Sequence, residues 1–260
     1  MIVAALRSEL VKLSRRTLLV GTYAGLGLAA SLFTILLFVQ APRTGGGGLP
    51  SLAQLAQPNG LIHGVNRAAV LLGVVAFGIA ASQIANEYSL GTLRQLLVRQ
   101  PRRPVFLAGK YLGVLLFLVG AVLFSSVVAT GVAFVMAHLR GVPTAAWTSG
   151  TGIADLTRAL GDLVLATVGF ATFGLVVGLL FRSSVAAIIV GFVWLLPFEN
   201  IVVRIVPQTA SWLPGQLLQF LAEGGSTTAD FSHSLVLSGF YLLVAMAAAT
   251  IVFQRKDVTA

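Results

Sequence analysis

The sequence predicts an all-α integral membrane protein with six transmembrane helices and both termini in the cytoplasm. Of its 260 residues, 57% are hydrophobic and only 10% are charged, whereas about a quarter of a soluble domain is charged. The apolar residues are gathered into six runs, most of which approach the roughly 20 residues that a helix needs to cross a bilayer. Basic residues concentrate in the connections on one side, which fixes the orientation.

The six spans are expected within a single transmembrane domain, residues 1–260, at about 17–39, 68–86, 105–138, 158–181, 183–198 and 234–253. The first follows a basic N-terminus, as a signal peptide would, but the run from Leu18 to Val39 is too long for the apolar core of a cleaved signal. The fifth is interrupted by Pro197 and Glu199. We therefore expect that helix to kink or end near Pro197 and a non-spanning helix to follow.

The charge distribution separates the two sides of the membrane. Most of the 17 basic residues fall in the N-terminus, in the segment 87–104 and at the C-terminus, and such an excess marks cytoplasmic connections. The net charge of +9 then faces anionic lipid or a partner protein at the cytoplasmic rim. A role in binding nucleic acid is not expected.

Two further helices are expected to lie at the membrane surface instead of crossing it. In the first 16 residues, Val3, Leu6, Leu10 and Leu13 share one helical face, which predicts an amphipathic interface helix before the first span. Short external helices are expected between spans five and six, where Leu217, Leu218 and Leu221, together with Trp212, suit an interfacial position.

No catalytic residue, metal site or bound cofactor is predicted. Gly109 and Lys110 resemble part of a phosphate-binding loop, but Pro104 and Tyr111 stand where that loop needs Gly and Ser or Thr. Lys110 is instead expected to extend from the membrane edge towards the cytoplasm. The chain has no cysteine, and its three histidines are isolated at the external ends of spans: His63, His138 and His233.

Small and hydroxyl-bearing residues mark two further candidate sites. Glycines four residues apart let helices approach closely in lipid, either within one subunit or at a dimer seam: Gly21 and Gly25, Gly174 and Gly178. Hydroxyls in the first and third spans either bond their own backbone carbonyls or line a weakly polar translocation path: Ser31, Thr34, Ser125, Ser126 and Thr130.

The segment NEYSLGTLRQLLVRQPRRP, residues 86–104, is a polar interruption between two apolar runs. Glu87 is expected at the start of a new helix, where a carboxylate suits exposed N–H groups. Leu90, Leu93 and Leu97 share one face, and Pro101 ends the helix after about three turns. These patterns leave two interpretations open: a basic loop that only fixes topology, or a short amphipathic helix that binds a partner.

The run EYSLGTLRQLL from Glu87, the PRR that follows from Pro101 to Arg103, and Gly109 with Lys110 resemble the cytoplasmic loop of ABC type-2 transporter permeases. The basic amphipathic N-terminus, the ending FQRKDVTA and the six-span layout are also similar to this family. The resemblance implies a bacterial plasma-membrane exporter subunit that pairs with a second permease subunit, identical or different.

The same resemblance assigns roles to residues of the loop. It implies that the segment 87–104 is a coupling helix that docks on a separate ABC ATPase subunit, which binds the ATP and magnesium that this chain does not bind. The chain would have no ATPase domain and no enzymatic site of its own, and its substrate would be a hydrophobic or amphipathic drug, lipid or peptide. The alternative is a non-transporting scaffold or assembly protein that binds a cytoplasmic partner through the basic loop. The implied coupling residues are Glu87, Gly91, Thr92, Arg94, Pro101 and Arg103, with Lys110 at the exit.

Overall fold

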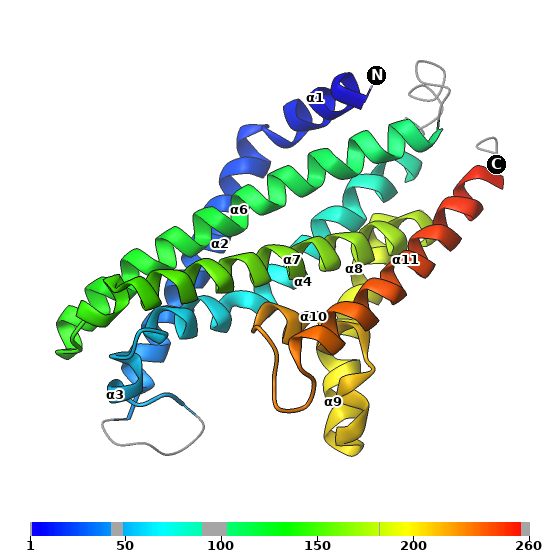
Figure 1. The fold of residues 1–260 in the computed structure, drawn as a ribbon. Coiled ribbons are helices and arrows are strands. Elements are labelled where there is room, and N and C mark those ends of the chain that lie inside the picture. Colours follow the sequence, from blue (N-terminus) through cyan, green and yellow to red (C-terminus); the bar gives the residue numbers. More distant parts are fainter. Residues whose placement is uncertain (1, 43–48, 90–102, 182, 256–260) are drawn as a thin grey trace.

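The computed structural model describes all residues except 1, 43–48, 90–102, 182 and 256–260 (Figure 1). The described residues form helices and no strands. Among these residues, six helical segments are long and apolar enough to cross a membrane, which confirms the predicted all-helical class and agrees with the predicted number of spans. Figure 1 shows α1, the start of α6 and the end of α11 at one end of the bundle, and α3 and α9 at the other.

The first half of the chain supplies three of these segments. They are α2 (Arg16–Gln40), α4 (Gly60–Ser89) and α6 (Arg103–Arg140). Two shorter helices accompany them: α1 (Ile2–Leu13) precedes α2 and packs on α6, and α3 (Leu52–Leu55) precedes α4.

The second half begins with a 3₁₀ turn, η1 (Ala145–Thr148), and the long helix α7 (Gly150–Phe181). The fifth segment is composite: α8 (Ser184–Val193), a π-helical turn η2 (Trp194–Phe198) and α9 (Glu199–Ile205) follow one another without a break. A second 3₁₀ turn, η3 (Pro207–Ser211), then leads to α10 (Pro214–Ala222), and α11 (Phe231–Arg255) is the sixth segment.

The bundle is built around the pair α4 and α7, which make the most extensive contact between any two elements. In an 18-residue apolar stretch of each helix, 61% of the residues of α4 and 72% of those of α7 are buried, against 11% of those of α11. Glycine permits this close approach, because a Cβ at Gly174 would lie 2.2 Å from the Phe77 carbonyl oxygen and one at Gly178 would lie 2.5 Å from that of Ala81. The helices α8–α9 and α11 lie at the periphery.

The interruption predicted in the fifth segment occurs at Pro197, which lies inside the π-helical turn. Proline has no backbone N–H and its ring clashes with the preceding turn, and a π turn absorbs this local defect without ending the helix. The chain stays helical through Ile205. The residues after the proline therefore form a continuation of the fifth segment, and the separate short helix is α10.

The leucines of that short helix are placed differently from the prediction. Leu217, Leu218 and Leu221 are buried to 2% exposure or less, because α10 packs on α7 and α11. Trp212 is 60% exposed. A short helix therefore exists where the sequence predicted one, as α10, but its apolar face packs inside the bundle and not against a membrane surface.

Candidate functional site

A cluster of four charged side chains, three of them buried, joins α1, α4 and α6 at the end of the bundle where α1 lies and α11 ends (Figure 1). We call it the ionic cluster; its members are Glu9, Lys12, Glu87 and Lys110. Glu87 lies two residues before the end of α4 at Ser89, and Lys110 lies seven residues after the start of α6 at Arg103. Two carboxylates and two ammonium groups give the cluster no net charge.

Lys110 is the centre of the ionic cluster. Its Nζ lies 2.7 Å from Glu87 Oε1 and 3.0 Å from Glu9 Oε2, and the Lys110 side chain is only 2% exposed. The prediction that Lys110 extends to the cytoplasm is therefore wrong. Charges in membrane helices are costly unless they are paired with one another, and such positions are commonly functional.

Lys12 closes the cluster from the more exposed side. Its Nζ lies 2.7 Å from Glu9 Oε1 and 3.2 Å from Glu87 Oε1. Partial burial by itself would lower the pKa of Lys12, but the hydrogen bonds and charges of Glu9 and Glu87 outweigh it and raise that pKa above its usual value. The protonated, positively charged form is therefore the one that the site favours.

Glu87 lies in the last turn of α4 and not at the start of a new helix. Its side chain is buried, and Oε1 accepts hydrogen bonds from both Lys12 and Lys110. Within the described residues, Oε2 has no hydrogen-bond partner. The expected contact between this carboxylate and exposed helical N–H groups is replaced by an ion pair between α4 and α6.

Local sequence explains how α1 reaches the other two helices. Leu6, Glu9 and Leu13 recur at helical spacing, so Glu9 belongs to the face that packs on α6. Gly113 of α6 makes room for this face, since a Cβ at that position would lie 2.8 Å from Glu9 Cβ. The amphipathic helix predicted at the N-terminus therefore has its apolar face, with one carboxylate, against the bundle.

A further polar contact adds the fifth segment to this region. Ser184, in the first turn of α8, donates a hydrogen bond to Asn86 Oδ1 at 2.5 Å. Ser183 caps the same helix by accepting from the Ala186 amide. The last turn of α4 thus contacts α1, α6 and α8 through neighbouring side chains.

The remaining predicted coupling residues are placed as follows. Arg103 begins α6, close to the ionic cluster in sequence. Gly91, Thr92, Arg94 and Pro101 lie outside the described residues, so their role stays a prediction.

The predicted glycine sites have two different environments. Gly174 and Gly178 lie in the contact between α7 and α4 inside the chain. Gly21 and Gly25 of α2 are exposed, and a Cβ at either would meet nothing within 4 Å. The first pair serves packing within the subunit, and the second leaves an open face of small residues on α2.

The hydroxyls predicted for a translocation path mostly bond their own helices. Ser31, Thr34, Ser125 and Ser126 each donate to the backbone carbonyl four residues earlier, at 2.7–2.9 Å. Thr34, Ser125 and Ser126 are also buried, while Thr130 is half-buried. This arrangement agrees with the structural alternative that the sequence left open.

Sequence reasoning missed the roles of Glu9 and Lys12 and the pairing of Lys110. The available signal was Glu9 itself, a carboxylate in register with Leu6 and Leu13 on the apolar face of an amphipathic helix. Lys12 lies 3 residues after Glu9 in the sequence, and Lys110 lies 101 residues after it. Helical spacing could therefore have predicted the pair with Lys12 but not the pair with Lys110.

A third buried carboxylate, Glu199, lies towards the opposite end of the bundle. It is fully buried, and it accepts hydrogen bonds from Trp194 Nε1 at 2.7 Å and from the amides of Gly215 and Gln216 at 2.9 and 2.8 Å. These two amides belong to the first turn of α10, where orphan N–H groups favour a negative charge. Glu199 therefore fixes the start of α10 to the fifth segment.

Taken together, the six long apolar helices and the paired charges buried among them define a multi-pass helical membrane protein. The chain belongs to the family described as proteins of unknown function, DUF2705, whose family model matches residues 48–259. No curated protein matches the chain.

Proposed function

We propose that this chain is the membrane-spanning permease subunit of an ABC exporter, driven by a separate ATPase subunit and paired with a second permease subunit. The proposal rests on the resemblance of residues 87–110 to the type-2 permease loop and is supported by the six-helix bundle. It places both termini and the segment 87–104 in the cytoplasm of a bacterium, below its plasma membrane.

The ionic cluster is the observation that carries the proposal. Glu87 and Lys110 flank the segment 90–102 on its two sides and form an ion pair with Nζ and Oε1 2.7 Å apart. Because this ion pair joins the end of α4 to the start of α6, we expect the two helices to move as one unit. A push by an ATPase on the loop would then reach α4 and α6 together, and α1 through Glu9.

The proposed cargo is a hydrophobic or amphipathic molecule such as a drug, lipid or peptide. ATP and magnesium would be bound by the partner ATPase, so this chain would act as a transport subunit without a catalytic site. The exposed glycine face of α2, with Gly21 and Gly25, suits close approach of a second permease subunit.

Reconstitution with its ATPase tests the proposal. We expect the purified chain to carry with it an ATPase that contains a phosphate-binding loop, and we expect ATP-driven transport in proteoliposomes. Glu87→Ala and Arg94→Glu should reduce this transport while membrane insertion is retained. Arg7→Glu, an exposed charge reversal on α1, is the matched control and should transport normally.

Two outcomes would contradict the proposal. Normal coupled transport in both loop variants would remove the coupling role of the segment. Capture of a cytoplasmic partner that has no ATPase activity would favour the scaffold or assembly function instead.

A further inference from the structure

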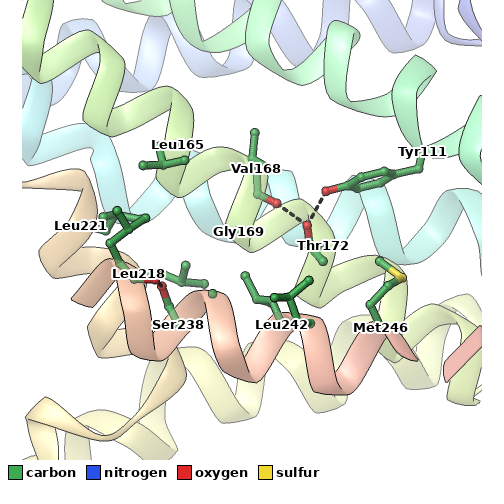
Figure 2. A pocket seen from close by; sticks show the side chains of 13 residues that line it. Tyr111, Leu165, Val168, Gly169, Thr172, Leu218, Leu221, Ser238, Leu242 and Met246 are labelled. Atoms are coloured by element: carbon green, nitrogen blue, oxygen red, sulfur yellow. Dashed lines mark hydrogen bonds between the residues drawn. The ribbon is translucent and has the colours of Figure 1, made fainter. Parts of the chain in front are cut away.

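A cavity of ≈ 340 Å³ lies between α7, α10 and α11, and no residue of the ionic cluster or of the predicted hydroxyl path lines it (Figure 2). It extends along α11 from Leu235 to Met246, which is about 16 Å at 1.5 Å per residue. Leu218 and Leu221 of α10 contribute to its wall, and Tyr111 reaches it from α6. This volume falls at the lower end of the range for small-molecule sites.

The wall of the cavity carries no charged side chain; leucine is its commonest residue, and valine, methionine and glycine also contribute. Its polar groups are the hydroxyls of Tyr111, Thr172 and Ser238. An apolar wall with a few polar groups is typical of sites that bind small apolar molecules in one orientation.

The hydrogen bonds in Figure 2 determine what these polar groups can offer to a ligand. Thr172 donates to the Val168 carbonyl at 2.7 Å, so the short contact between Tyr111 and Thr172 uses the tyrosine proton. Since no described residue donates to it, the phenol oxygen of Tyr111 has an acceptor position available to a ligand. Ser238 likewise donates to the Leu235 carbonyl. Both groups are thus arranged to accept a hydrogen bond from a ligand.

The cavity is open to the outside of the bundle between α7 and α11. Leu165, Leu235 and Leu243 line it and are also 37%, 38% and 73% exposed. At this level along two membrane-spanning segments the surrounding solvent is lipid, so molecules with an apolar chain reach the opening directly. The volume suits a single chain better than a two-chain phospholipid.

We propose that this cavity is a binding site for a single-chain amphiphile that carries a hydrogen-bond donor, such as a long-chain alcohol. The apolar chain lies against α11, and the donor group bonds the oxygen of Tyr111 or Ser238. This site needs only the membrane location of the bundle and does not depend on ATP-driven export.

Photolabelling of the purified protein in lipid nanodiscs tests the site. The probe is a hexadecanol analogue with a photoreactive diazirine in the chain, and its methyl ether is the matched probe without the donor. We expect the alcohol to label peptides of α7 and α11, and the ether to label them about tenfold less, the effect of losing one well-formed hydrogen bond. In the double variant Tyr111→Phe and Ser238→Ala, which removes both acceptor oxygens, labelling by the alcohol should fall to the level of the ether.

A cavity-filling variant gives an independent readout. Gly239 lines the cavity and a Cβ there meets nothing within 4 Å, so Gly239→Leu should fill the space and abolish labelling by both probes. Gly161 of α7 is equally unobstructed but does not line the cavity, so Gly161→Leu should label like the unaltered protein.

The same experiment can overturn the proposal. Equal labelling by the alcohol and the ether in the unaltered protein would remove the hydrogen-bonding role. Labelling that persists in folded Gly239→Leu, or that falls equally in Gly161→Leu, would show that the probe samples the lipid-facing surface and not the cavity.

Discussion

At the scale of single residues, the ionic cluster shows how four charges become acceptable inside an apolar bundle. Each carboxylate is within 3.2 Å of an ammonium nitrogen, and Lys110 reaches both carboxylates. A buried pair gains little over an apolar replacement, because desolvation offsets the attraction, but removal of one partner leaves an uncompensated charge. We therefore infer that the ionic cluster determines the relative positions of α1, α4 and α6 more than it adds to stability.

Replacement of Lys110 should be far more costly than replacement of Lys12. Lys110→Met leaves two buried carboxylates with one half-exposed lysine, and we expect it to lower the free energy of unfolding by about 3 kcal/mol. Lys12→Met should cost less than about 1 kcal/mol, because the Lys12 side chain is 41% exposed and screened.

Thermal and denaturant unfolding in detergent micelles would measure both effects, with exposed Arg7→Met on α1 as the control. In the double variant that also carries Glu87→Gln, much of the loss caused by Lys110→Met should be regained, since Glu9 keeps its ion pair with Lys12 and no buried carboxylate is left unpaired. Equal losses for Lys110→Met and Lys12→Met would contradict the assignment of Lys110 as the centre.

The pKa of Lys12 predicts a pH dependence with a defined direction. Because that pKa is raised on folding above its usual value of 10.5, the protonated lysine stabilises the native state below that value, and the contribution is lost as the pH rises through the folded pKa. The stability difference between the unaltered protein and Lys12→Met should therefore be constant from pH 7 to 9 and vanish in strong alkali. A difference that grows with pH in unfolding experiments would refute this sign.

At the scale of elements, the contact between α4 and α7 depends on glycines that leave no room for a side chain. A methyl group at Gly174 would overlap the Phe77 backbone, which cannot move like a flexible side chain. Gly174→Ala should therefore destabilise the bundle by about 2 kcal/mol or more.

Gly161→Ala, on the same helix as Gly174, is the matched control, since its new methyl group meets nothing within 4 Å. It should leave the stability of the chain unchanged. Thermal unfolding of both variants would check this, and an unaffected Gly174→Ala would mean that the two helices are less tightly packed than described.

Glu199 determines the position of another element, α10. Glu199 Oε1 accepts hydrogen bonds from Trp194 and Gly215, and Oε2 accepts one from Gln216. Glu199→Gln replaces one of these oxygens by an NH₂ group, which cannot accept a hydrogen bond from the donor that it then faces. We expect faster amide hydrogen exchange in residues 214–222, because α10 would lose its fixed start.

Glu223→Gln is the control for this experiment. Glu223, just beyond the other end of α10, is exposed, and it accepts a hydrogen bond only from Gln219 among the described residues. Exchange in residues 214–222 should be unchanged in this variant. Slow exchange in Glu199→Gln would show that packing alone holds α10.

At the scale of the whole molecule, the number of spans was predictable because it depends on runs of apolar residues. The ends of the spans were less predictable: α4 begins at Gly60 instead of 68 and includes Arg67, and α7 begins at Gly150 instead of 158 and includes Asp155. Helices continue past charged residues at the membrane edge, where water solvates them, so a search for charge-free runs truncates them.

The candidate site was predictable only in part. The loop pattern directed attention to Glu87, and the N-terminal periodicity indicated a helix that packs through one face. The ionic cluster itself depends on contacts over 23, 75 and 101 residues. No local spacing encodes such contacts, and the same holds for the cavity, which combines residues of α6, α7, α10 and α11.

The most direct test of the permease proposal uses the absence of cysteine from the chain. A single cysteine introduced by Gln95→Cys lies in the proposed coupling segment, and Ser232→Cys places one near the start of α11, at the opposite side of the membrane in the proposed topology. Cross-linking in native membranes with a short bifunctional reagent, followed by mass spectrometry, would identify the neighbours of each. We predict that Gln95→Cys captures an ABC ATPase and that Ser232→Cys does not; capture of no ATPase at Gln95, in a protein that is inserted and folded, would contradict the proposal.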